Sequence, residues 1–232
     1  VGDCYLMAAL ISLAKKNPQA IVNCFTQGVK NVENEDDIDI RFFHLKENKA
    51  VPIVITVNKR KIIDPTGMKN NALWPKLIEK AYAVYRKREY ERILKYEGKK
   101  LDGGFFEIVL FAITGKSPKV FDNEKDVDKI VSKINSILES SRALGCGFKE
   151  NFEIKDMKTR EKITIYRGHA YAIVGIGEKN SKKYIRLINP YKDDGRKPEN
   201  NLKSKEGGHI AISVEDFTFH YESLDYTSRK YR

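Results

Sequence analysis

The sequence predicts an α+β protein of two lobes, in which a mainly helical N-terminal lobe faces an antiparallel β-sheet lobe. The chain opens with an apolar run at helical spacing, and further helical periods follow as far as residue 141. From residue 143 onward the pattern becomes strand-like, and short polar turns separate the middle strands, as in an antiparallel sheet. A glycine-containing break at 101–104 divides the regions, so we assign residues 1–101 to the first lobe and 102–232 to the second.

The first helical segment carries a cysteine at its start. Asp3 suits the N-cap position, and Leu6, Leu10 and Leu13 recur at helical spacing. Cys4 then lies in the first turn, where unpaired backbone N–H groups and the helix dipole favour an anion. We expect this position to lower the pKa of the Cys4 thiol and favour the reactive thiolate. The alternative is a buried structural cysteine, which is the commoner fate of cysteine in an apolar run.

The remaining elements follow from periodicity and turn residues. Helices are predicted at 19–25, 73–85, 105–114 (ending at Gly115) and 126–141. Strands are predicted in the first half at 38–45, 51–57 and 62–67, and in the second half at 143–148, 162–166, 169–176, 184–189 and 209–214.

Composition bounds the classes of function. The 232 residues carry a formal net charge of +11, mostly from scattered lysines, and no stretch alternates basic with aromatic residues as in a nucleic-acid recognition module. We therefore expect a solvated lysine-rich surface and no nucleic-acid partner. No apolar run is long enough to span a bilayer. No signal peptide is visible, and because the sequence begins at Val1 without methionine we expect it to be a fragment.

The three cysteines show neither paired spacing nor a zinc-ligand pattern. Cys4, Cys24 and Cys146 are isolated from one another, and an odd, sparse count fits free thiols better than a disulfide framework. The sequence leaves the cellular location open, although free thiols favour the cytoplasm. No metal site is predicted from these residues.

A histidine and an asparagine flank a predicted hairpin. His169 starts one strand, Asn189 ends the next, and a polar connection centred near Asn180 joins them. Such a hairpin sets His169 opposite Asn189 within about one residue of register, close enough for a hydrogen bond. An asparagine oxygen can fix the histidine tautomer and leave the other ring nitrogen to face a thiolate. Cys4, His169 and Asn189 together would form the triad of a cysteine protease. The alternative is a strand-edge histidine and a turn asparagine with no common role.

These segments resemble the three catalytic motifs of the calpain cysteine proteases. The residues are 2–10 around Cys4, 168–171 around His169, and Asn189 with the proline after it, and they occur in calpain order. Segments 73–83, 102–104, 144–146 and 214–217 are also similar to calpain segments, so the resemblance covers nearly the whole chain. It implies a papain-like core of two lobes with a cleft between them. It also implies that Cys4 is the nucleophile, His169 the general base and acid, and Asn189 the orienting residue.

The resemblance extends to the surroundings of the triad. Asp3 and Gly168 flank the reactive residues and are candidates to line the substrate cleft, as is Tyr191. Calpains usually carry tryptophan where this chain has Tyr191, so an aromatic ring is kept at that position. Calpains also carry a glutamine six residues before the cysteine, which the sequence as given begins too late to include.

The predicted chemistry requires no cofactor, and the partners are protein or peptide substrates. Calcium dependence stays open, because the acidic segments 33–39 and 193–194 match no calcium loop of the family and there is no EF-hand pattern. Two other functions are considered. One is a papain-like acyltransferase or transglutaminase, because fold and triad are shared among these reactions. The other is a non-catalytic module that holds nucleic acid or another anionic partner through its basic surface.

Overall fold

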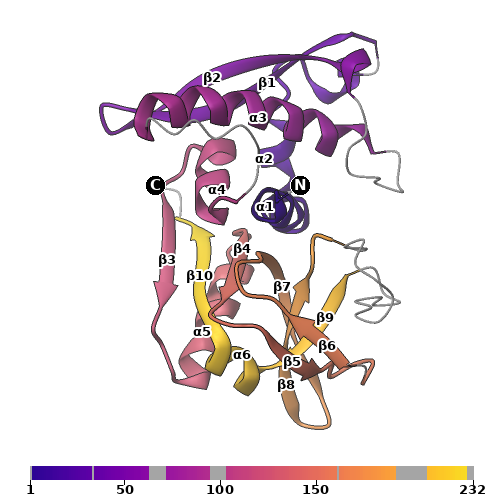
Figure 1. The fold of residues 1–232 in the computed structure, drawn as a ribbon, viewed down its shortest axis with the longest axis vertical. Helices are drawn as coiled ribbons and strands as arrows, with labels where there is room; N and C mark the ends of the chain where they lie inside the picture. Colours follow the sequence, from indigo (N-terminus) through magenta and orange to yellow (C-terminus); the bar gives the residue numbers. More distant parts are fainter. Residues whose placement is uncertain are drawn as a thin grey trace.

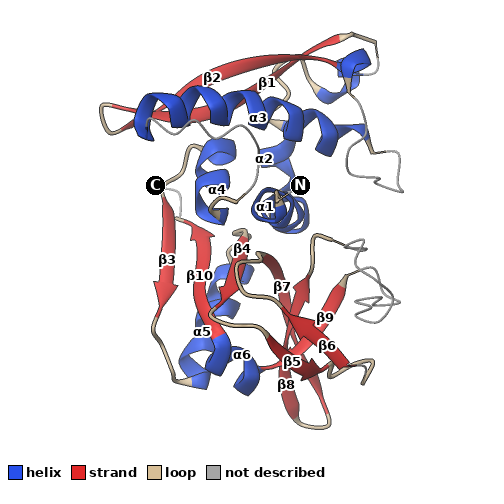
Figure 2. Ribbon diagram, in the orientation of Figure 1, coloured by secondary structure: helices blue, strands red, loops and turns tan. Residues whose placement is uncertain are grey.

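The computed structural model describes residues 2–32, 34–62, 72–94, 103–160, 162–191 and 208–228. It confirms the predicted α+β class. Helices α1 to α4 and a two-stranded sheet form one side of the molecule, and a six-stranded antiparallel sheet with two further helices forms the other (Figures 1 and 2). In these views helix α1 lies between α3 and the large sheet, where the two sides of the molecule meet.

The N-terminal side combines four helices with a long hairpin. The helices are α1 (Cys4–Lys16), α2 (Pro18–Val22), α3 (Leu73–Leu94) and α4 (Phe106–Thr114). The hairpin is β1 (Asp37–Lys46) paired with β2 (Lys49–Asn58), and short 3₁₀ helices occur at Val29–Val32 and Lys59–Lys61.

The C-terminal side is organised by an antiparallel sheet of order β3-β10-β4-β7-β8-β9. Its strands are β3 (Pro118–Asp122), β4 (Leu144–Phe148), β7 (Tyr171–Lys179), β8 (Lys182–Ile188), β9 (His209–Ser213) and β10 (Tyr221–Thr227). A separate pair joins β5 (Phe152–Lys155) to β6 (Lys162–Ile165), and the helices are α5 (Val127–Glu139) and α6 (Val214–His220).

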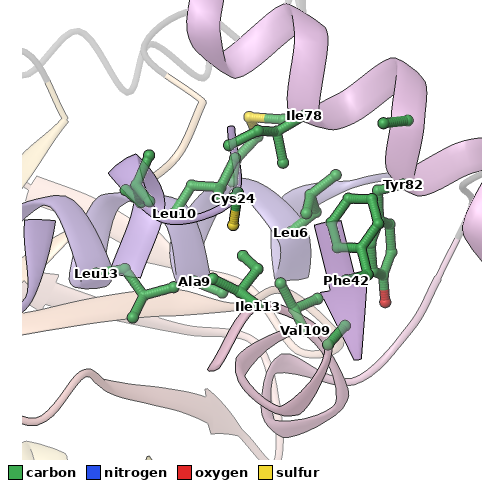
Figure 3. Packing of buried hydrophobic residues seen from close by; sticks show 14 of the residues in the cluster. Leu6, Ala9, Leu10, Leu13, Cys24, Phe42, Ile78, Tyr82, Val109 and Ile113 are labelled. Atoms are coloured by element: carbon green, nitrogen blue, oxygen red, sulfur yellow. The ribbon is translucent and has the colours of Figure 1, made fainter. Parts of the chain in front are cut away.

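The buried residues form two apolar clusters, and α1 is central to the first. Figure 3 shows Leu6 and Leu10 of α1 among residues from α3, α4 and β1, which include Tyr82 and Phe42. This first cluster continues through Ile113 of α4 and also takes in Ala143, Ala172 and Ile188 beside or within the large sheet. The predicted lobe boundary after residue 101 lies outside the described residues, and α4, which follows it, packs in the first cluster.

The second cluster lies between the large sheet and helices α5 and α6. Ile130, Ile134 and Ile137 share one face of α5, as their spacing predicted, and all three are fully buried. Phe148 of β4 and Phe217 of α6 meet edge-on with ring centroids 5.7 Å apart. This cluster packs against the sheet that contains β7 and β8.

Local end signals place two helices as predicted. The Asp126 side chain accepts hydrogen bonds from the N–H groups of Asp128 and Lys129, so α5 begins with a capped first turn. Helix α4 ends at Gly115, whose φ of 66° is the left-handed conformation that glycine adopts without strain.

Other boundaries differ from the prediction. Helix α3 runs to Leu94 rather than ending at residue 85, because its charged continuation consists mainly of good helix formers that show no apolar stripe. Strands β3, β5 and β10 were not predicted; β10 follows α6 directly, with no turn residues to mark it. Of the strand predicted at 62–67, Ile62 lies outside any strand and the rest lies outside the described residues.

Candidate active site

The cysteine of the first helix lies where the sequence predicted, but the aspartate before it does not cap that helix through its side chain. Asp3 occupies the N-cap position, and its main-chain oxygen accepts the N–H groups of Leu6 and Met7 at 2.9 and 3.0 Å. The expected side-chain cap is absent. The Asp3 carboxylate is 1% exposed and instead accepts a hydrogen bond from the Tyr191 hydroxyl at 2.5 Å.

The thiol of Cys4 lies beside the segment that carries His169. Backbone N–H groups of Ala170 and Tyr5 point to the Cys4 sulfur and favour the thiolate. Burial has the larger effect and raises the pKa of Cys4 above its usual value, and the nearby Asp3 charge raises it further. The expectation that the helix start lowers this pKa overall is therefore wrong, because a sequence shows the first turn but not the desolvation of the sulfur.

Strands β7 and β8 bring His169 and Asn189 together. The His169 Nε2 atom lies 2.8 Å from Asn189 Oδ1. The hairpin turns at Asn180 and Ser181, both with positive φ, close to the predicted centre.

The register of this hairpin differs from the prediction. The turn pairs Lys179 with Lys182, and this register continued regularly would set Asn189 opposite residue 172. An irregularity between Ile173 and Gly175 moves the pairing one position toward the predicted register, so that Ala172 faces Ile188. Continued by one position, this pairing sets Asn189 opposite residue 171, so His169 lies two residues from direct opposition. The His169 and Asn189 side chains therefore form a diagonal pair at the end of the β7–β8 hairpin, not a directly facing pair.

The hydrogen bonds of Asn189 determine which nitrogen of His169 carries the proton. The backbone N–H of Tyr191 lies 3.0 Å from the same Asn189 Oδ1 atom, and an N–H needs an acceptor. The amide is thereby oriented with its oxygen toward both groups, so His169 Nε2 is a donor. In the neutral ring Nδ1 is then the nitrogen without a proton, and it is able to accept one.

Two tyrosines hold the histidine ring. Tyr191 stacks on His169 with centroids 5.4 Å apart and planes 30° from parallel. Tyr171 meets the same ring edge-on at 4.8 Å, and Tyr171 itself is fully buried. The stack with Tyr191 follows from the shifted register, because residue 191 is the position that faces His169.

The flanking candidates differ in accessibility. Gly168 is exposed, has a φ of 67°, and leads the chain into His169. Tyr191 is half-buried. Asp3 is buried against Tyr191, so its side chain does not offer the substrate-lining surface that the sequence suggested.

Sequence reasoning missed a glycine that supports Asn189. The N–H of Asn189 donates to the main-chain oxygen of Gly208 at 2.8 Å. Gly208 has a φ of 85°, and a Cβ atom there would lie 2.6 Å from the Asn189 oxygen. The only sequence signal was the Gly207–Gly208 pair just before β9, which indicates a turn but not its neighbour.

Comparison with known proteins identifies the family. The family described as calpain family cysteine protease matches residues 1–196. The chain belongs to the calpain family of cysteine proteases. Calpain-8 of Rattus norvegicus is 26% identical over 97% of this chain, and the calpain-2 catalytic subunit of Homo sapiens is 24% identical over the same share. In both cases the match covers 34% of the relative, so the chain spans about a third of the length of these curated calpains.

The described residues of this calpain-family chain also bear on metal binding and on membrane spanning. Among the described residues no group of three or more His, Cys, Asp or Glu side chains could hold a metal ion. The acidic residues 193 and 194 lie outside the described part of the chain. Within the described part, no helix combines the length and apolar character needed to cross a membrane.

Proposed function

We propose that this chain is the catalytic core of a cysteine endopeptidase in which Cys4 is the nucleophile, His169 the general base and acid, and Asn189 the residue that orients His169. The observation that carries the proposal is the shared Asn189 oxygen. It accepts from His169 Nε2 at 2.8 Å and from the Tyr191 N–H at 3.0 Å, which leaves His169 Nδ1 as the basic nitrogen. The Ala170 N–H, one residue on from His169, points to the Cys4 sulfur.

The first step of the proposed reaction is proton transfer from Cys4 to His169. Burial raises the pKa of the Cys4 thiol, so the thiolate forms by passing its proton to His169 Nδ1 as an ion pair. Backbone N–H groups of Ala170 and Tyr5 then stabilise the negative sulfur.

The remaining steps follow from this ion pair. The thiolate attacks the peptide carbonyl carbon, and the negative oxygen that develops can accept from the Cys4 N–H, which has no intrahelical acceptor at the first position of α1. His169 gives its proton to the leaving amine as the carbon–nitrogen bond breaks and a thioester remains. His169 then takes a proton from water, and the hydroxide attacks the thioester to release the acid and regenerate the thiol.

The proposed substrates are flexible protein or peptide segments that bind where residues 1–101 and 102–232 meet as two lobes. Gly168 is exposed beside His169, and a residue without a side chain there allows a substrate backbone to approach. Tyr191, which stacks on His169, is the other candidate to border the substrate.

Labelling of the full-length protein with iodoacetamide tests the nucleophile. We expect rapid modification at Cys4, loss of that modification in Cys4→Ala, and loss of cleavage of an unfolded protein substrate in the same variant. Cys24→Ala is the matched control, because Cys24 is fully buried and burial raises its pKa to about 12. Equal labelling of wild type and Cys4→Ala would remove Cys4 from this role. Amine incorporation into a glutamine donor without peptide cleavage would instead indicate a transglutaminase.

A further inference from the structure

Tyr191 contacts both members of the His169–Asn189 pair. Its backbone N–H donates to Asn189 Oδ1 at 3.0 Å, and its ring stacks on His169 at 5.4 Å between centroids. The position of the Tyr191 ring is therefore tied to the orientation of the imidazole and of the amide that holds it.

The hydroxyl of the same tyrosine bonds to the residue that precedes Cys4. Tyr191 Oη donates to Asp3 Oδ1 at 2.5 Å and accepts from the Asp3 backbone N–H at 3.0 Å. Asp3 is 1% exposed, and among the described residues its second oxygen, Oδ2, has no hydrogen-bond partner. The tyrosine hydroxyl is thus the donor that meets this buried carboxylate, and losing it would leave a buried charge poorly compensated.

We propose that Tyr191 is a positioning residue whose hydroxyl, paired with Asp3, holds the start of α1 and the His169–Asn189 pair at the separation that the reaction needs. This inference rests on the proposed function. The Asp3–Tyr191 pair joins residues 188 positions apart, so it links two segments that the chain itself leaves independent. A tyrosine ring suits this role because it has few rotatable bonds, and a displacement of about 1 Å at a reacting group can cost about 100-fold in rate.

The two-way bonding is specific to a hydroxyl group. An oxygen of this kind can donate to the Asp3 carboxylate and accept from the Asp3 N–H at once, whereas an indole N–H can only donate. Tryptophan, the residue that calpains usually carry here, could therefore replace at most one of the two bonds. The hydroxyl of Tyr191 therefore gives this chain a pair of bonds to Asp3 that a tryptophan at the same position could not make in full.

Removing the hydroxyl alone tests the proposal. We expect Tyr191→Phe, which keeps the ring stack, to lower kcat for a peptide substrate about 10-fold with KM within about 2-fold, because geometry rather than binding is lost. Iodoacetamide should also modify Cys4 about 5- to 10-fold more slowly at neutral pH, because the thiolate depends on a correctly placed His169. Asp3→Asn keeps an acceptor oxygen for the hydroxyl and should retain more kcat than Asp3→Ala.

A matched control separates positioning from general stability. Tyr221 is fully buried and makes the same two-way bond far from the site, donating to the Glu124 main-chain oxygen at 2.9 Å and accepting from the Glu124 N–H at 2.9 Å. Tyr221→Phe should lower the melting temperature while kcat and the alkylation rate stay within about 2-fold of wild type. If Tyr191→Phe does not fold, the comparison of Asp3→Ala with Asp3→Asn tests the same bond from its other end, because only the alanine variant removes the acceptor of the Tyr191 hydroxyl.

The outcomes distinguish this inference from the proposed function. If wild type cleaves peptides and Tyr191→Phe matches it in kcat and in alkylation rate, the positioning role is overturned while the peptidase assignment stands. A faster alkylation in Tyr191→Phe also overturns it, because the hydroxyl would then shield the thiol rather than position its partner. If wild type cleaves nothing, the proposed function fails, and the alkylation rates of Cys4 still report whether Tyr191 positions His169 against it.

Discussion

Ser12 of α1 exchanges two hydrogen bonds with Leu144 of β4. The Ser12 Oγ donates to the Leu144 main-chain oxygen at 3.0 Å and accepts the Leu144 N–H at 2.8 Å, and both residues are fully buried. One hydroxyl therefore satisfies both polar groups of a buried residue at the start of a strand. Asp3, just before α1, bonds to Tyr191, which follows β8. Helix α1 is therefore hydrogen-bonded to the C-terminal side of the molecule both at its start and near its end.

Replacing this serine should destabilise the protein strongly. Ser12→Ala leaves a buried N–H and a buried carbonyl without their partner, and we expect the free energy of unfolding to fall by about 2–3 kcal/mol. Urea denaturation followed by circular dichroism measures the change. Ser140→Ala is the control, because the exposed Ser140 bonds to main-chain oxygens of its own helix and to the neighbouring Arg142 side chain at the surface, and its loss should change the value by less than about 0.5 kcal/mol. Similar losses in the two variants would show that the Ser12–Leu144 contact contributes little.

Removing the acceptor of the histidine should lower activity more than stability. Asn189→Ala deletes the oxygen that His169 Nε2 and the Tyr191 N–H share, so the proton is no longer held on Nε2. We expect kcat/KM for peptide cleavage to fall about 10- to 100-fold. Asn189→Asp keeps an acceptor oxygen in the same place and should retain more activity than the alanine variant. An alanine variant as active as wild type would mean that Asn189 does not orient His169.

The local signals in the sequence predicted most elements because they act within a few residues. The Asp126 cap and the Gly115 stop are set by neighbouring backbone groups, and a sequence displays both. The meeting of His169 and Asn189 could likewise be expected from a hairpin with a polar turn. The register of this hairpin was predicted wrongly. The turn pairs Lys179 with Lys182, and the irregularity at Gly175, where the absent side chain leaves room for Arg186, brings the pairing only one position closer to the predicted one.

The non-local features of the site could not be predicted in the same way. The pKa of Cys4 depends on burial by segments far along the chain, and burial reverses the effect expected from the helix start. The support of Asn189 by Gly208 and the bonding of Tyr191 to Asp3 join residues that no periodic pattern relates. The position of strand β10 between β3 and β4 also depends on pairing with residues far away in the sequence.

The glycine behind Asn189 should be sensitive to a single added carbon. In Gly208→Ala the new Cβ would lie 2.6 Å from the Asn189 main-chain oxygen, so the Asn189 backbone has to move. We expect kcat/KM to fall about 10-fold, since Asn189 orients His169 in the proposed mechanism. Gly28→Ala is the control: Gly28 has a similar φ of 81° and nothing within 4 Å of the added atom. Gly28→Ala therefore introduces a similar backbone strain but no steric clash. Equal activities of Gly28→Ala and Gly208→Ala would contradict the prediction.

A buried carboxyl between α4 and β10 links stability to pH. Burial and, to a smaller extent, the nearby Glu107 charge together raise the pKa of Asp225 to about 7. Burial also raises the pKa of Glu107. Between about pH 4 and pH 7 the folded chain thus keeps a proton on Asp225 that the unfolded chain has released. Stability from this group is present at low pH and is lost as the pH rises through that window.

Asp225→Asn should remove this dependence because an amide stays neutral at every pH in the range. At pH 4, the lower end of this window, the variant and wild type should have similar melting temperatures, apart from the hydrogen bond that the Ser223 hydroxyl gives Asp225. At pH 8, where wild type carries a buried charge near Glu107, the variant should be more stable by roughly 1–3 kcal/mol. Thermal unfolding across pH 4–8 measures the difference between the two proteins, so the contributions of other titrating groups cancel. A constant difference over this range would show that Asp225 titrates at the same pH in the folded and the unfolded chain.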